Sequence, residues 1–285
     1  MTTFMMRAVL ALIATGAALI FAASGVAPIQ AAAAPVETGR FVWHDLMTRD
    51  VIAAKRFYGD LLGWRFEDTK RGDRPYVLAR IGSEPVAGFV DITANATAGQ
   101  QWLSFMAVTD VDATATQVQA AGGKILVPPR ELDALARVAV VTDPQGAPLG
   151  IARLQRDRPD PTQPTANHFF WDEYLARDAA QALTFYKSIA GYTSTISDSR
   201  LGIEYHVLRN SRGRAGLFQL PPAAADVEPN WLPYVMVSDP VALAARVPAL
   251  GGRILRPAAP ERRNNTLVII ADPGGAPLAL QKYPY

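Results

Sequence analysis

The stretch RFVWHDLMTRDVIAAKRFYGDLLGW, Arg40 to Trp64, predicts a strand, a helix and a helix stop in immediate succession. Its beginning, FVWHDL, is short and rich in aromatic and apolar residues, which is typical of a strand. Asp50 is a candidate helix N-cap, and apolar residues then recur at helical spacing until Gly63. We therefore expect a strand followed by a helix between Asp50 and Gly63.

The same pattern returns later as HFFWDEYLARDAAQALTFYKSIAGY, His168 to Tyr192. Trp171 follows Trp43 by 128 residues (43 to 171), and the Phe-Tyr pair and the glycine that ends the helix repeat at the same separation. A repeat of this kind indicates a duplicated structural unit.

The heptapeptide D-P-x-G-A-P-L also occurs twice, beginning at Asp143 and Asp272, 129 residues apart. One residue of drift over such a length indicates a duplicated domain. We expect a first copy at residues 39–155, a proline-rich linker at 156–166 and a second copy at 167–285. Asp-Pro-x-Gly is turn chemistry between antiparallel strands, so these residues are expected to be structural.

Each copy predicts the element order β-α-β-β-β twice, with further helices at 112–121, 178–190 and 241–250. The predicted strands are FVWHDL, YVLARIG, VAGFVDIT, WLSFMAVTD, KILVPP, ARVAVVTD and PLGIARL in the first copy, and FFWDEY, EYHVLR, GLFQL, LPYVMVS, RILRP, LVIIAD and PLALQKY in the second.

Composition narrows the functional classes. The net charge of +2 and the lack of a basic run give no indication of a nucleic-acid partner. The chain has no cysteine, which excludes disulfides, thiol catalysis and thiolate metal ligands. The duplication supplies four modules in one chain, which favours a monomer.

Residues 1–34 are typical of a secretory signal peptide, with Arg7 before an apolar run and small residues in A-x-A patterns near Ala32 to Ala34. The alternative is an uncleaved membrane anchor, but the apolar run is about 16 residues, shorter than the roughly 20 that a spanning helix needs. We expect a secreted or periplasmic protein without a membrane anchor after cleavage.

The pattern resembles the vicinal oxygen chelate superfamily, which contains glyoxalase I, bleomycin-resistance proteins and extradiol dioxygenases. The resemblance rests on D-x-x-x-A-x-x-F-Y-x-x-x-x-G-W at Asp50–Trp64 and its second copy, the helix that ends in A-G-G, and D-P-x-G before the last strand. It implies an α+β fold of two tandem glyoxalase-like domains, each with two βαβββ modules that form a curled mixed sheet around a cavity.

The resemblance also implies where a divalent metal ion would be held. Catalytic members place His or Glu ligands on the first and last strands of the modules. By position, the corresponding residues here are Trp43, Asp91, Ser104 and Gly150 in the first copy, and Trp171, Gln219, Pro233 and Ala279 in the second. This set cannot supply the several oxygen or imidazole ligands that a hard cation requires, so we expect no metal and no cofactor.

His44 stands one residue from a ligand position. Neighbours on a strand face opposite sides, so His44 is expected to face the helix layer if Trp43 faces the cavity. A register slip of one residue would instead turn His44 towards Asp91. The matched residue of the second copy, Asp172, is not a histidine.

An indole at the metal position offers an aromatic wall for a flat or apolar small molecule. Asp45 and Glu173 lie two residues further along the same strands and are candidate polar contacts. The alternative is that both indoles only fill the core. The candidate ligand-binding residues are Trp43, Asp45, Asp91, Ser104, Trp171, Glu173 and Gln219.

Three hypotheses about function remain open. The first is an exported, metal-free, small-molecule-binding protein. The second is a metal-dependent lyase, isomerase or dioxygenase with an atypical site around His44, Asp45 and Asp91. The third is a scaffold for a protein partner.

The signal-peptide interpretation gives a direct prediction. The mature chain is expected to begin near Ala33 to Val36, because the A-x-A pattern ends there. Edman sequencing of the exported protein checks this start. Recovery of an N-terminus at Met1 or Thr2 would contradict the interpretation.

Overall fold

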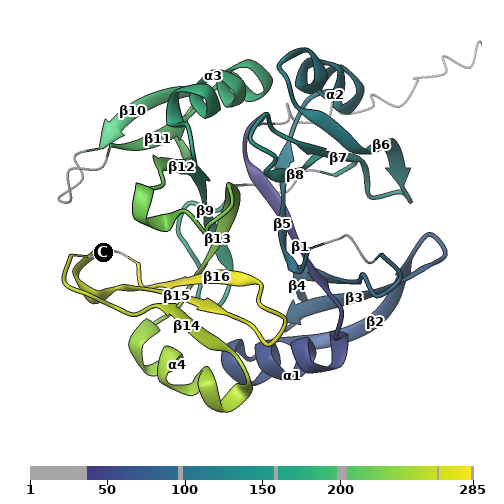
Figure 1. Ribbon diagram of the computed structural model, residues 1–285. Helices are drawn as coiled ribbons and strands as arrows, with labels where there is room; N and C mark the ends of the chain where they lie inside the picture. Colours follow the sequence, from purple (N-terminus) through teal and green to yellow (C-terminus); the bar gives the residue numbers. More distant parts are fainter. Residues whose placement is uncertain (1–36, 96–98, 157–159, 198–203, 262, 284–285) are drawn as a thin grey trace, which may run out of the picture. The chain divides into compact units, whose positions relative to one another are not determined.

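The computed structural model describes residues 37–95, 99–156, 160–197, 204–261 and 263–283 (Figure 1). The predicted signal segment lies outside these residues. None of the helices within these ranges is both long and apolar enough to span a membrane.

The first copy contains eight strands and two helices in the order that the repeat predicts. They are β1 (Phe41–Thr48), α1 (Val51–Leu62), β2 (Arg65–Arg71), β3 (Arg74–Ile81), β4 (Glu84–Asp91), β5 (Gln101–Ala107), α2 (Val111–Ala120), β6 (Lys124–Leu132), β7 (Ala136–Thr142) and β8 (Pro148–Leu154).

The second copy repeats this order with three short 3-10 helices added. Its elements are β9 (Phe169–Ala176), α3 (Ala179–Ala190), β10 (Thr193–Ser197), β11 (Tyr205–Arg209), β12 (Gly213–Gln219), η1 (Pro222–Ala224), β13 (Asn230–Met236), α4 (Pro240–Arg246), η2 (Pro248–Leu250), β14 (Arg253–Arg256), η3 (Arg263–Asn265), β15 (Leu267–Ala271) and β16 (Pro277–Gln281).

Each copy forms one eight-stranded mixed sheet. The strand orders are β2-β3-β4-β1-β5-β8-β7-β6 and β10-β11-β12-β9-β13-β16-β15-β14, so the second sheet repeats the first. At the centre of the first sheet, β1 and β5 pair antiparallel, β1 pairs parallel with β4, and β5 pairs parallel with β8. In the second sheet, β9 and β13 pair antiparallel, β9 pairs parallel with β12, and β13 pairs parallel with β16. The α+β fold with two tandem glyoxalase-like domains is confirmed.

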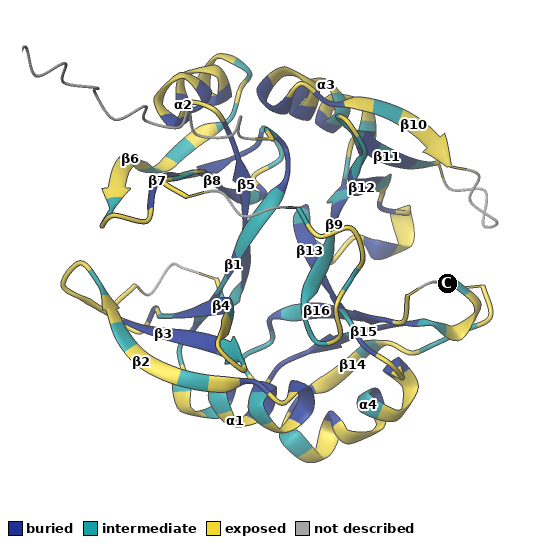
Figure 2. Ribbon diagram, turned by 180° about the vertical axis from the view of Figure 1, so that it is seen from behind, coloured by how far each residue is buried: buried dark blue, intermediate teal, exposed yellow. Residues whose placement is uncertain are grey.

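The strands β2 and β10 were missing from the expected strands. The sequence of β2, RFEDTKR, carries charges on both faces, and β10 is the polar segment TSTIS. Both are outermost strands whose residues are largely exposed (Figure 2). An edge strand with little buried surface shows no apolar alternation, so periodicity does not detect it.

The helix signals were mostly accurate. The Asp50 side chain accepts a hydrogen bond from the Ala53 amide at 2.9 Å, and α1 ends at Gly63, whose φ is 72°. The fourth helix was expected at 241–250 but breaks after Arg246, and η2 begins at Pro248. Proline lacks the amide hydrogen that an α-helix needs at this point.

The helix layers of the two copies exchange partners. One apolar core contains Phe57 of α1 together with Val268 of β15, and the other contains Val118 of α2 together with Phe185 of α3. Figure 1 shows the same pairing, with α1 beside α4 and α2 beside α3. Each core is therefore built mainly from one module of each copy.

The D-P-x-G segments form the expected turns, and their aspartates also join the copies. Tyr58, from the Phe-Tyr pair of α1, donates to Asp272 Oδ2 at 3.3 Å, and Tyr186 of α3 donates to Asp143 Oδ2 at 3.0 Å. Each tyrosine oxygen accepts an indole N–H at 2.9 Å, from Trp102 in the first copy and from its counterpart in the second. The two motifs that mark the repeat thus meet across the copies.

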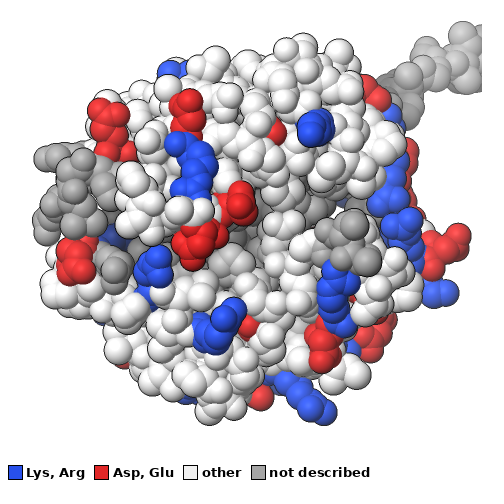
Figure 3. Space-filling view, viewed as in Figure 1, with Lys and Arg blue, Asp and Glu red and all other residues white. Residues whose placement is uncertain are grey.

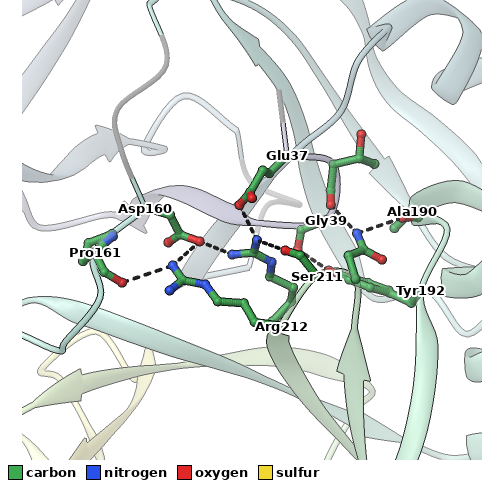
Figure 4. Close-up of polar contacts among 11 residues, drawn as sticks. Glu37, Gly39, Asp160, Pro161, Ala190, Tyr192, Ser211 and Arg212 are labelled. Carbon is green, nitrogen blue, oxygen red and sulfur yellow. Dashed lines mark hydrogen bonds and ion pairs between the residues drawn. The ribbon is translucent and has the colours of Figure 1, made fainter. Parts of the chain in front are cut away.

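A polar cluster fixes the segment before β1 and the linker to the second copy (Figure 4). The Arg214 guanidinium, whose side chain is 3% exposed, forms ion pairs with Asp160 of the linker and with Glu37. The Tyr192 hydroxyl donates to the carbonyl oxygen of Gly39. The segment before β1 and the linker between the copies are therefore both bound to the same part of the second copy.

We expect Tyr58→Phe to lower the free energy of unfolding by about 1–3 kcal/mol, because the Trp102 indole loses its buried acceptor and Asp272 loses a donor. Urea denaturation measures this change.

A double-mutant cycle with Asp272→Asn isolates the contact between the copies. We expect a coupling free energy above about 0.5 kcal/mol for these neighbouring residues. Strict additivity of the two changes would contradict a stabilising Tyr58–Asp272 hydrogen bond.

Candidate functional site

We call the face of each sheet that points away from its α-helices the inner face (Figure 1). On the first copy, Trp43 packs there against Leu103 and Phe105. Its indole Nε1 donates to Asp45 Oδ1 at 2.8 Å, and Tyr76 of β3 donates to the same oxygen at 2.6 Å. We call Trp43, Asp45 and Tyr76 the Trp43 cluster.

Gly88 makes this arrangement possible. It pairs with Asp45 in the parallel register of β1 and β4. A Cβ atom at Gly88 would lie 1.6 Å from the Tyr76 hydroxyl and 2.2 Å from Asp45 Oδ1. The hydroxyl and the carboxylate therefore lie directly above the β4 backbone, where only glycine leaves room.

Only one of the two oxygens of the Asp45 carboxylate accepts hydrogen bonds from the described residues. Among the described residues, both of its hydrogen-bond donors bind Oδ1, which leaves Oδ2 able to accept another donor. Burial raises the pKa of Asp45, although the donors Tyr76 and Trp43 and the charge of Arg71 act in the opposite direction. The Arg71 guanidinium lies over the Tyr76 ring, 4.6 Å from its centre.

The second copy contains a related cluster in which both carboxylate oxygens accept hydrogen bonds from neighbouring side chains. Trp171 Nε1 donates to the Tyr205 hydroxyl at 3.1 Å, and Tyr205 donates to Glu173 Oε2 at 2.9 Å. Tyr234 donates to Glu173 Oε1 at 2.9 Å. We call Trp171, Glu173, Tyr205 and Tyr234 the Trp171 cluster.

Arg263 of η3 completes the Trp171 cluster. Its Nη2 atom lies 3.3 Å from Glu173 Oε2 and 3.2 Å from the Tyr205 hydroxyl oxygen. The guanidinium carbon also lies 5.6 Å from the centre of the Tyr205 ring and 5.8 Å from that of Tyr234, within cation–π range. Both carboxylate oxygens of Glu173 are therefore occupied, and its charge is paired.

The structure separates the seven predicted site residues. Trp43 and Asp45 lie together, as do Trp171 and Glu173, on the inner faces. Ser104 pairs directly with His44 and lies on the opposite face of the sheet, where its hydroxyl donates to Asp172 Oδ1 at 2.6 Å. The expectation that Ser104 faces the cavity was wrong, because the inner position on β5 belongs to its neighbours.

Asp91 and Gln219 also lie away from the inner-face clusters. Asp91 ends β4, three residues after the inward-facing Gly88, and its exposed carboxylate accepts a hydrogen bond from the Thr93 amide at 2.8 Å. Gln219 ends β12, is exposed and accepts a bond from the Ala179 amide at 3.3 Å. Strand alternation places both on the face opposite to their clusters.

His44 faces away from Trp43, as the expected register requires. Its Nε2 atom lies 3.0 and 3.1 Å from the two oxygens of Asp172, and its ring stacks on Phe169 with centres 4.0 Å apart. His44 and Asp172 hold the same position in the two copies, so the pair joins equivalent strands. The register slip that would join His44 to Asp91 does not occur.

The inner-face residues do not fit a divalent metal ion. In the first copy, the central strands β1, β4, β5 and β8 present Asp45 together with Trp43, Gly88, Leu103 and Gly150, so one carboxylate stands beside four residues without a side-chain oxygen or imidazole. In the second copy, Glu173 likewise stands beside Trp171, Gly216, Leu232 and Ala279. No group of three His, Asp or Glu side chains suited to a metal ion occurs among the described residues.

A cavity of about 330 Å³ lies elsewhere, between the copies. Trp102 and Trp231 line it, but their indole N–H groups bind the buried tyrosines described above. Gln100, also in its lining, is held by the Arg49 amide and the Gly274 carbonyl. These groups join the two copies, so the inner-face clusters are the better candidates for function.

Replacing Asp45 by Asn is expected to raise the free energy of unfolding at pH 7 and to have little effect below about pH 3.9. Because burial raises the pKa of Asp45 in the folded state, its ionised form costs stability above that pKa. Below the unfolded pKa the carboxyl is protonated in both states, and the cost disappears.

Asn keeps the accepting oxygen for Trp43 and Tyr76, so the contacts survive the change. Urea denaturation of both proteins at pH 3.5 and pH 7 measures the difference. A stabilisation of equal size at both pH values would show that the charge of Asp45 is not its source.

Comparisons with known proteins agree with this architecture. The model of the Glyoxalase/Bleomycin resistance protein/Dioxygenase superfamily matches residues 40–151. CFP32 of Mycobacterium tuberculosis, provisionally named a glyoxylase, is 30% identical over 244 residues, covering 84% of this chain and 93% of the relative. The anthracycline biosynthesis protein DauV of Streptomyces sp. (strain C5) is 26% identical over 233 residues, covering 76% of this chain and 83% of that protein.

Among solved structures, the Mn(II)-bound glyoxalase from Novosphingobium aromaticivorans aligns with a TM-score of 0.55 and 15% identity, covering 87% of this chain and 83% of that chain. At this identity the likeness concerns the fold alone. The sequence match along most of the chain to CFP32 establishes the wider relationship. The chain therefore belongs to the glyoxalase/bleomycin resistance protein/dioxygenase superfamily.

Proposed function

We propose that this protein binds a flat aromatic small molecule with a hydrogen-bond donor on the inner face of the first copy, without a divalent metal ion. The observation that carries the proposal is the half-buried Asp45, whose Oδ1 is held by two donors while Oδ2 has no partner among the described residues. A carboxylate that is held in place through one oxygen, with the other oxygen able to accept a hydrogen bond, favours a ligand that donates a hydroxyl or N–H hydrogen.

The surrounding side chains favour an aromatic body for this ligand. The partly buried Trp43 offers its indole beside Leu103 and Phe105, and Arg71 adds a planar cation above Tyr76. Aromatic and guanidinium planes contact flat rings over a large area. Two relatives are named anthracycline biosynthesis proteins, and anthracyclines are polycyclic aromatic compounds with phenolic hydroxyls.

Binding without a metal is supported by the donor set. The inner positions of the central strands carry indole, glycine and leucine, and a single carboxylate does not hold a hard cation. The alternative of an atypical metal site around His44, Asp45 and Asp91 has no geometric support, because these side chains lie on different faces of the sheet or at its end. We therefore derive no metal-dependent reaction.

We also propose that the protein acts as a monomer outside the cytoplasm and that its partner is a small molecule. Figure 3 shows scattered Lys and Arg side chains with Asp and Glu side chains among them on a largely uncharged face, which supports a small molecule rather than a nucleic acid. The predicted signal peptide supports action outside the cytoplasm, and the four modules in one chain support a monomer.

We expect Trp43→Ala to weaken the binding of 2,6-dihydroxyanthraquinone about 5- to 150-fold, which corresponds to about 1–3 kcal/mol for a large aromatic contact. This probe is flat, and its separated hydroxyls do not chelate metals. Isothermal titration calorimetry measures the dissociation constant, and 2,6-dimethoxyanthraquinone, which lacks the donors, is expected to bind more weakly.

The same variant tests whether the indole only fills the core. Loss of about 3–5 kcal/mol of unfolding free energy, with unchanged binding, would assign Trp43 to packing and reject the proposed site. Dialysis against Mn, Fe, Ni or Zn followed by elemental analysis is expected to leave no stoichiometric metal. Stoichiometric retention that is required for binding would reject the metal-free proposal.

A further inference from the structure

We infer that the second copy is closed by its own side chain: Arg263 is a built-in cationic ligand of the Trp171 cluster and restricts the protein to one bound ligand per chain. The restriction to one ligand rests on the proposed function of the Trp43 cluster. The closure itself is a property of the second copy and can be tested without any ligand for the first.

The two inner faces differ in how their carboxylates are used. Asp45 binds two donors through one oxygen, whereas both oxygens of Glu173 are bound, one by Tyr234 and the other by Tyr205 and Arg263. The Glu173 side chain is 7% exposed and that of Arg263 is 20% exposed, so this ion pair is largely shielded from water. A ligand donor would have to displace a charge-assisted contact.

Arg263 interacts with the Trp171 cluster in two ways, through an ion pair and through cation–π contacts. Its guanidinium neutralises Glu173, and it lies within cation–π distance of both tyrosine rings that bind the same carboxylate. An acidic group flanked by aromatic faces is the environment that organic cations prefer. The side chain therefore occupies the space as a guanidinium ligand would.

The backbone around Arg263 indicates a specific role for this placement. Arg263, Asn264 and Asn265 have φ values of 49°, 54° and 63°, three successive non-glycine residues in the left-handed region. This conformation is unfavourable for residues with a Cβ atom and persists only where other contacts compensate for it. The contacts of Arg263 with Glu173 and the tyrosines provide such compensation.

The corresponding turn of the first copy places no arginine in the Trp43 cluster. The corresponding turn between β6 and β7 has the sequence Asp133-Ala134-Leu135, with only Asp133 in the left-handed region, at a φ of 50°. Asp133 reaches towards the Gly72 amide at 3.5 Å instead of entering the Trp43 cluster. The carboxylate of the first copy thus keeps one oxygen without a partner among the described residues, whereas that of the second copy is closed by Arg263.

A chemical-rescue experiment tests the closure directly. In Arg263→Ala, methylguanidinium is expected to enter the vacated space and raise the melting temperature in a saturable manner, beyond the effect of NaCl at the same concentration. Arg256→Ala is the matched control, because Arg256 is exposed and, among the described residues, its side chain bonds only the main-chain carbonyl of Leu255. Absence of specific rescue, or equal rescue of the control, would overturn the closure.

Calorimetric titration with 2,6-dihydroxyanthraquinone tests the restriction to one ligand. We expect one ligand per chain for the wild type, Arg256→Ala and Arg263→Lys, and a second ligand for Arg263→Ala. In Trp43→Phe/Arg263→Ala, the second ligand is expected to quench tryptophan fluorescence by an amount that is lost when Trp171→Phe is added, because Trp64, Trp102 and Trp231 are present in both variants. Arg263→Gln provides the same readouts if the alanine variant does not fold.

The outcomes separate the two proposals. Two ligands on the wild type, or an unchanged single ligand on both Arg263→Ala and Arg263→Gln, would overturn the restriction to one ligand. A wild-type protein that binds no probe would reject the proposed function of the first copy and, with it, the restriction to one ligand. Methylguanidinium rescue would still support the closure of the second copy.

Discussion

The reciprocal tyrosine–aspartate hydrogen bonds across the two copies are the interaction on which the rest of the structure depends. Tyr58 binds Asp272 and Tyr186 binds Asp143, and each hydroxyl also accepts a buried indole N–H. These polar chains lie beside the two apolar cores that join modules of different copies. A buried polar group without a partner is costly, so each of these hydrogen bonds favours the packing of the two copies against each other.

This exchange of partners covers the helix-bearing face of each sheet and leaves the other face to the aromatic clusters. His44 and Asp172 show the consequence on the central strands, since both are buried and bonded to each other where the copies meet. Their neighbours in sequence, Trp43 and Trp171, face the opposite way. The alternation of a strand thus separates the residues that hold the copies together from those that could contact a ligand.

The two inner faces share a plan, with a tryptophan and a carboxylate on the first strand and a tyrosine hydroxyl above a glycine. They differ in charge pairing. One oxygen of Asp45 has no partner among the described residues, whereas Glu173 is neutralised by Arg263, a residue from a turn that has no counterpart of the same composition in the first copy. Duplication followed by a few substitutions can therefore change a shared site chemically while the fold that positions it stays the same.

The sequence by itself determined the duplication, the helix signals at Asp50 and Gly63, the inward direction of Trp43 and the poor metal-ligand set, because spacing and residue chemistry are local properties. It missed β2 and β10, which bury too little surface to show a pattern. Only the tertiary structure decided that Ser104 lies with His44, that Gly88 faces Asp45 and that Arg263 reaches Glu173. These contacts depend on strand register and on the path of a distant turn, and neither is encoded in the spacing of residues along one strand.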